Sequence, residues 1–99
     1  MKGLTMNEFY ESLYYGADID FSYNGLFYHI NAGIDNNSVY GIIVYEYTKH
    51  PDEQQSHCCE IYNKSFQNRN NGINEFLSSK LFDGKTIYEA EGEIEVLYG

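Results

Sequence analysis

The chain has 99 residues, 42% of them hydrophobic, which fits one globular domain spanning residues 1–99. Its 15 acidic and 6 basic residues give a formal net charge of −9, which disfavours direct binding to nucleic acid or to an anionic membrane surface. The same charge favours a basic protein as partner, or serves only to keep a small protein in solution.

A helix is predicted near the N-terminus, between Thr5 and Gly16. Thr5 and Glu8 have the spacing of a capping box, in which each side chain bonds the backbone N–H of the other residue. Gly16 supplies the C-terminal stop. The apolar residues between them share one helical stripe, which we expect to cover a sheet: Met6, Phe9, Tyr10, Leu13 and Tyr14.

The segment DIDFSYNGLFYHI, residues 18–30, predicts a β-hairpin. Asn24-Gly25 is the preferred pair for a two-residue type I′ turn between alternating strands. This register gives an apolar face on which Ile19, Phe21 and Tyr23 lie opposite Ile30, Tyr28 and Leu26. The other face carries Asp18, Asp20 and Ser22 opposite Asn31, His29 and Phe27.

The middle of the chain predicts two more strands. After a turn at residues 35–38, the apolar run from Val39 to Tyr47 is typical of a central strand, or of one covered on both faces. A polar loop containing Pro51 follows, and HCCEIYN, residues 57–63, predicts a weaker fourth strand. The Asn-rich stretch after it predicts a loop that leads into a helix at about Ile73.

The last third predicts a helix, a second short helix and a strand. Helical spacing links Ile73, Phe76, Leu77 and Leu81, and Asp83-Gly84 ends that helix. Thr86 and Glu89 form a second capping box, after which residues 94–98 alternate as a strand. Apolar residues from Ile87 to Leu97 also fit a single helix, but Gly92 and the β-branched residues favour a helix followed by a strand.

These elements predict an α+β fold. It consists of an antiparallel β-sheet of four to five strands. The N-terminal helix and one or two helices from the C-terminal half pack on that sheet.

No motif predicts catalysis, and we expect neither an enzyme nor a metal or cofactor. The metal-like cluster is His50, His57, Cys58 and Cys59, but adjacent cysteines in a strand point to opposite faces and cannot both reach one zinc ion. A cysteine–histidine nucleophile needs electropositive surroundings, which this chain does not supply. A small hydrolase with paired carboxylates is the least favoured alternative.

The chain is expected to be cytoplasmic. Cys58 and Cys59 have poor disulfide geometry, which fits a reducing compartment. The first residues lack the apolar run of a signal peptide, and no stretch approaches the roughly 20 apolar residues of a membrane span.

The C-terminal segment YEAEGEIEVLYG has a glutamate at every second position, namely Glu89, Glu91, Glu93 and Glu95. In a strand, the last three would share one face about 6.6–6.8 Å apart. That spacing is about two phosphate steps of one DNA strand, each of about 3.4 Å. An acidic strip of this kind, with Tyr88 or Tyr98 as an aromatic anchor, fits a groove built for nucleic acid.

Two blocks, EFYESLYYGADIDFSYNGLFYHI and FLSSKLFDGKTIYEAEGEIEVLYG, resemble small acidic bacterial proteins, some of them borne on mobile elements. Those proteins share the order helix, Tyr-Gly, acidic strand, Tyr-Asn-Gly, aromatic strand. The resemblance covers about half of the chain, Glu8 to Ile30 and Phe76 to Tyr98, and it implies a fold. It brings neither an activity nor catalytic residues.

These features together predict a small acidic protein-interaction module. The most specific form of this prediction is an inhibitor of a basic partner that handles nucleic acid. Small phage and mobile-element proteins act in this way against host defences. The candidate binding residues are Asp18, Asp20, Tyr88, Glu89, Glu91, Glu93, Glu95 and Tyr98. The alternative is a structural protein that assembles as a homodimer through strand edges and exposed tyrosines.

Overall fold

The structure is a computed structural model that describes residues 1–48 and 58–98. The predicted loop around Pro51, with His50 and His57, lies outside the described residues. The elements in chain order are α1 (Met6–Tyr15), β1 (Asp18–Tyr23), β2 (Leu26–Ile34), β3 (Tyr40–Tyr47), β4 (Cys58–Phe66), α2 (Arg69–Leu77), α3 (Ile87–Ala90), a 3₁₀ turn η1 (Glu91–Glu93) and β5 (Glu95–Tyr98).

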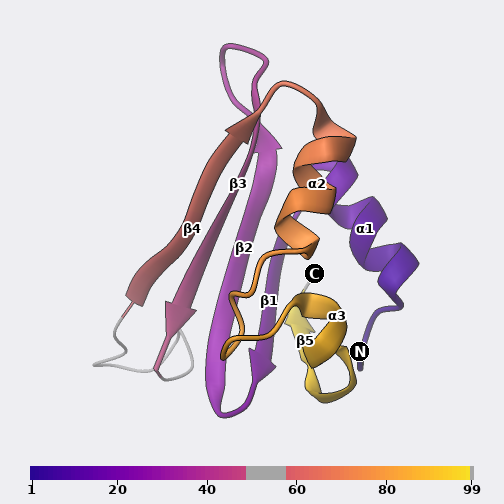
Figure 1. Cartoon of the computed structure of the whole chain (residues 1–99), viewed down its shortest axis with the longest axis vertical. Helices are drawn as coiled ribbons and strands as arrows, with labels where there is room; N and C mark the ends of the chain where they lie inside the picture. The colour runs from indigo at the N-terminus through magenta and orange to yellow at the C-terminus, as the bar shows by residue number, and fades with distance from the viewer. Residues whose placement is uncertain (49–57, 99) are drawn as a thin grey trace.

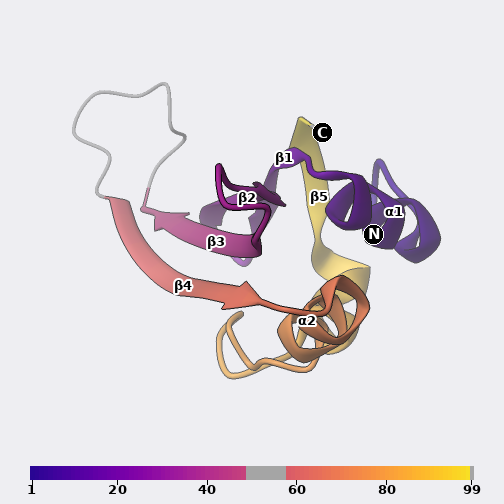
Figure 2. The ribbon, with the colours of Figure 1, turned by 90° about the horizontal axis from the view of Figure 1, so that it is seen from above.

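The five strands form one antiparallel sheet in the order β4-β3-β2-β1-β5 (Figure 1). Seen from above, α1 and α2 lie side by side on one side of the curved sheet (Figure 2). The apolar side chains of helices and sheet meet there in a single buried cluster. The predicted α+β fold is therefore confirmed, and β3 is an interior strand between β2 and β4.

Local signals place the first three elements as predicted. Thr5 and Glu8 form the capping box of α1, which ends at Gly16. Asn24 and Gly25, with φ angles of 53° and 79°, close the hairpin, and both angles have the positive sign that a type I′ turn requires. The hairpin register is the predicted one, from Tyr23 opposite Leu26 to Asp18 opposite Asn31.

The boundary between β4 and α2 differs from the prediction. The predicted loop after residue 63 is strand as far as Phe66, because its backbone pairs with Tyr40 and the next residues of β3. The side chain of Asn68 accepts a hydrogen bond from the Asn71 N–H, so α2 starts at Arg69, four residues earlier than Ile73.

The predicted helix is also shorter at its C-terminal end. It stops at Leu77, where the hydroxyl of Ser78 hydrogen-bonds the Asn74 carbonyl, and Leu81 lies beyond it. A turn follows, and it buries Phe82 completely against the rings of Phe21 and Tyr28.

The C-terminal segment folds as a short helix followed by a strand, as predicted. The second capping box, Thr86 with Glu89, starts α3, and β5 pairs with β1. The N-terminal segment lies against the other side of β5, where Lys2 exchanges backbone hydrogen bonds with Ile94 and Val96. None of the described helices is long and apolar enough to cross a membrane.

Candidate functional site

One face of the sheet points away from α1 and α2, and we call it the open face (Figure 2). Within residues 1–48 and 58–98, no helix packs on it. Strand register aligns its side chains in three rows from β1 to β4. The rows are Ser22–Phe27–Tyr47–Cys58, Asp20–His29–Tyr45–Glu60 and Asp18–Asn31–Ile43–Asn63.

The centre of the open face is aromatic and apolar. Phe27, Ile43, Tyr45 and Tyr47 all lie there half-buried, on the two neighbouring strands β2 and β3. A hydrogen bond with the Cys58 side chain, together with partial burial, raises the pKa of Tyr47, so its hydroxyl stays neutral. The centre therefore offers three aromatic ring faces and two phenol hydroxyls, those of Tyr45 and Tyr47.

The β1 side of the open face carries two carboxylates in a hydrogen-bonded group. Asp20 Oδ1 lies 2.5 Å from His29 Nδ1, and Asp18 Oδ1 accepts a hydrogen bond of 2.9 Å from Asn31 Nδ2. The other ring nitrogen of His29, Nε2, lies 3.8 Å from Asp18 Oδ1. Strand alternation puts both aspartates on this face as predicted, and their neighbours hold them in place.

A third carboxylate lies on the β4 side of the same face. Glu60 is opposite Tyr45, and its Oε1 accepts a hydrogen bond from Asn63 Nδ2. Three strand spacings separate it from Asp20, a distance of about 14 Å. No Lys or Arg stands on the described parts of β1 to β4 on this face, so the aromatic centre is flanked by acids on both sides.

The predicted row of glutamates does not form. Glu89 caps α3, and Glu91 accepts a hydrogen bond of 3.3 Å from the N-terminal amine. Glu93 lies in η1, and only Glu95 belongs to β5. The capping box starts a helix, and each helical residue turns the side-chain direction by about 100°, so alternate residues no longer share a face.

The other candidates are dispersed. Glu95 is opposite Ser22 at the edge of the open face, but Lys2 Nζ lies 3.9 Å from its carboxylate. Tyr88 is 55% exposed on α3, which packs on the helix side of the sheet through Ile87. The backbone of Tyr98 pairs with β1, whereas its side chain lies outside the described part of the chain.

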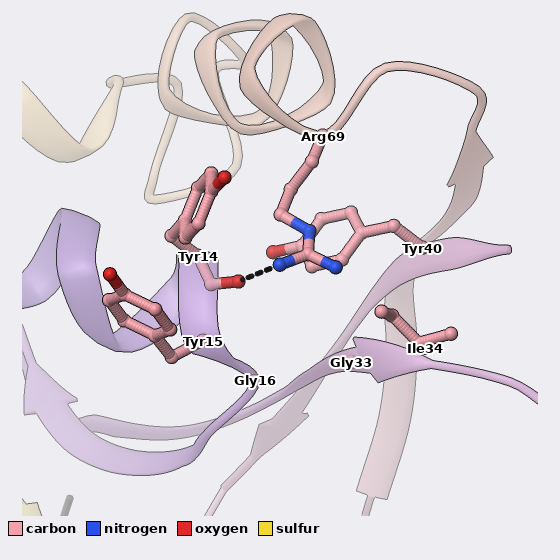
Figure 3. A pocket seen from close by; sticks show the side chains of 7 residues that line it. All are labelled: Tyr14, Tyr15, Gly16, Gly33, Ile34, Tyr40 and Arg69. Atoms are coloured by element: carbon pink, nitrogen blue, oxygen red, sulfur yellow. Dashed lines mark hydrogen bonds between the residues drawn. The ribbon is translucent and has the colours of Figure 1, made fainter. Parts of the chain in front are cut away.

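The prediction missed a cleft beside Gly33 and Ile34, at the end of β2 that lies away from the Asn24-Gly25 turn (Figure 3). Its volume is about 160 Å³, and Arg69 at the start of α2 lies in it between two tyrosine rings. The sequence signal was weak, because Arg69 is a single cation inside an Asn-rich stretch predicted as a loop.

No family model, curated protein or solved structure matches this chain. Within the described residues, no three His, Cys, Asp or Glu side chains are arranged to hold a metal ion.

Proposed function

We propose that the protein is a small acidic interaction module that binds a basic protein through the open face. The observation that carries the proposal is the arrangement of this face. Asp18 and Asp20 on one side and Glu60 on the other flank an aromatic centre, and the described parts of β1 to β4 place no Lys or Arg there.

The face suits lysine and arginine side chains in two ways. Its carboxylates attract cations and raise the rate of encounter with a basic partner. The ring faces of Tyr45 and Tyr47 then accept the cation or its aliphatic stem, and a cation–π contact adds about 0.5–2 kcal/mol. A partner bound over the aromatic centre also buries apolar surface, which a purely electrostatic contact would not do.

The proposed partner is a protein that handles nucleic acid. Proteins that handle nucleic acid present clustered Lys and Arg, because they neutralise phosphates. Occupying such a cluster would inhibit the partner, in the manner of small phage or mobile-element proteins that act against host defences. Because the C-terminal glutamates do not share one face, inhibition of such a partner would depend on Asp18, Asp20 and Glu60.

The test compares two double variants with the same change in net charge. Asp18→Asn/Asp20→Asn removes two of the three carboxylates that flank the centre of the open face, whereas Glu11→Gln/Glu93→Gln neutralises two exposed carboxylates on α1 and η1. Each tagged protein is incubated with lysate of the native host at low and at high salt, and retained proteins are identified by mass spectrometry. We expect a basic protein that the native chain and the control retain at low salt and that the open-face variant loses.

The purified partner then gives dissociation constants for the same variants. Loss of two charge contacts at the open face should weaken binding at least tenfold more than the control change. If both variants weaken binding of the partner equally, the affinity depends on the net charge of the protein and not on the open face. Retention by all three proteins would refute the open face as the binding surface.

A homodimer through β4 is the second candidate. Strand β4 is the last strand on its side of the described sheet, so its outer backbone groups are available for pairing with another copy. Multi-angle light scattering at low and high salt tests this directly. A dimer that persists at high salt would favour assembly through the strand edge, because such pairing does not depend on charge.

A further inference from the structure

The Arg69 cleft has the features of a binding site for an anion. The guanidinium is fixed by three contacts: Nη1 donates a hydrogen bond of 2.9 Å to the Tyr14 carbonyl, and Cζ lies over two rings, 4.8 Å from the Tyr14 centroid and 5.3 Å from the Tyr40 centroid (Figure 3). One of its five N–H donors is used in this way, and the planar group is held in one orientation.

Arg69 has no carboxylate partner within residues 1–48 and 58–98. Among the described lysines, Lys2 and Lys64 pair with a glutamate. Lys80 and Lys85 pair with none of the described carboxylates but are exposed to solvent, whereas Arg69 is half-buried. A half-buried guanidinium with free, parallel N–H donors matches the two oxygens of a carboxylate in geometry and in charge.

The rim of the cleft is apolar. Four large apolar side chains of the described chain are strongly exposed, and two of them, Tyr15 at 79% and Ile34 at 55%, line this cleft. They stand on α1 and β2, beside Gly16 and Gly33, which leave the floor free of side chains (Figure 3). An apolar group attached to the carboxylate would contact both residues.

The volume limits the size of the ligand. The cleft holds about 160 Å³, below the roughly 300–1,000 Å³ of sites for drug-sized molecules. A cavity of about 150 Å³ accommodates a molecule the size of benzene. The cleft is therefore large enough for one side-chain-sized group.

We infer that the Arg69 cleft binds a carboxylate attached to a small apolar group. Two sources present this chemistry: a free short-chain carboxylic acid, or the C-terminal residue of a polypeptide that ends in an aliphatic side chain. In both, the carboxylate bonds the free N–H groups of Arg69, and the apolar group lies against Ile34 and Tyr15.

The experiment titrates ¹⁵N-labelled protein at constant ionic strength and follows the backbone amide signals of Gly16 and Gly33 by NMR. The probes are isocaproate and the tripeptide Gly-Gly-Leu with a free C-terminus, each compared with its amide. We expect the acids to shift these signals and the amides to bind at least about tenfold more weakly, because a charge-assisted hydrogen bond is lost. Shifts with isocaproate alone identify a small acid as the ligand, and shifts with the tripeptide alone identify a polypeptide C-terminus.

Two variants test the geometry. Arg69→Gln should abolish the shifts. Because Arg69 also packs α2 against α1, Ile34→Asp supplies a second variant that repels a carboxylate without touching the core. Its matched control is Tyr88→Asp, at a side chain that is also 55% exposed and lies on α3. Absence of shifts, equal binding of acids and amides, or full binding by the Ile34→Asp variant would overturn the inference.

Discussion

Replacing Gly72 by alanine should destabilise the protein, although alanine is the better helix former. Gly72 is buried inside α2, and helix propensity alone predicts a gain of about 1 kcal/mol. A Cβ atom at this position would lie 2.4 Å from Cγ and 2.5 Å from Cδ2 of Phe66. Carbon atoms pack best at about 3.5–4.0 Å, so the backbone of α2 or the ring must move by about 1 Å.

The ring cannot move away cheaply. Phe66 Cβ also lies only 2.8 Å from the added atom, and the backbone of Phe66 is paired with Tyr40 at the end of β4. Overpacking of this kind costs about 1–3 kcal/mol. With three atoms in conflict the upper part of that range applies, and after the helix-propensity gain the net loss is about 1–2 kcal/mol.

Urea denaturation followed by circular dichroism measures this loss. Asn74→Ala is the matched control, because it lies in the same helix at an exposed position and should leave the free energy of unfolding unchanged or raise it. The double variant Phe66→Ala/Gly72→Ala removes the conflict, so Gly72→Ala should stabilise that background. A Gly72→Ala protein as stable as the native one, or a penalty that persists without the Phe66 ring, would refute the reasoning.

Further predictions concern tyrosine burial and helix capping. Burial raises the pKa of Tyr40 to about 12, so the fold favours the neutral phenol and its stability falls as pH rises from 10 to about 12. In urea titrations on either side of pH 10, Tyr40→Phe should reduce this slope by up to about 1.4 kcal/mol per pH unit. At neutral pH the same variant loses the hydrogen bond of 2.6 Å to the Leu13 carbonyl, at a cost of about 1 kcal/mol. Thr86→Ala should cost about 0.5–2 kcal/mol, and Thr5→Ala at the equivalent cap of α1 should cost a similar amount in the same assay. The Thr86 backbone N–H lowers the pKa of Glu89, so this stabilisation is lost as pH falls below 4.5, and Glu89→Gln should make acid unfolding less steep.

Elements with a strong local signal were predictable from the sequence. The turn at Asn24-Gly25 sets the hairpin register by itself, because only that register puts the alternating apolar residues on one face. The boxes at Thr5 and Thr86 set the starts of α1 and α3, because their hydrogen bonds close within four residues. The α+β fold follows from these elements and from the apolar run of β3.

The elements that were mispredicted depend on distant residues. Lys64 has low strand propensity, yet its backbone pairs with Ile42, and the next residue, Ser65, pairs with Gly41. Apolar spacing suggested that Leu81 continues α2, but the chain turns there to bury Phe82. In both segments, contacts with distant residues determine the secondary structure, and a local sequence pattern carries no information about such contacts.

The candidate site was likewise predictable from the sequence only where its residues belong to an element with a strong local signal. Asp18 and Asp20 were assigned to one face because they belong to the hairpin, whereas an alternating glutamate pattern fits a strand and also a cap followed by a turn. Arg69 contacts Tyr14 across 55 positions of sequence, so no local pattern indicates the cleft. The prediction also passed over Glu60, which reaches the open face through the pairing of β4 with β3.

The open face and the Arg69 cleft are opposite in charge and share strand β2. His29 of the open face and Ile34 of the cleft are separated by five residue steps of strand, about 17 Å. This distance is about twice the Debye length of about 8 Å at physiological ionic strength, so a substitution of Asp20, which bonds His29, leaves the field at the cleft largely unchanged. Asp18 lies only two residues from Gly16 of the cleft, so its charge acts on both surfaces. Substitutions of Asp20 and Glu60 therefore test the open face separately from the cleft, and substitutions of Arg69 test the cleft. A chain with net charge −9 would gain long-range attraction for basic partners from most of its surface. Arg69 is half-buried and has no carboxylate partner among the described residues, and the proposed ligand of the cleft would supply one.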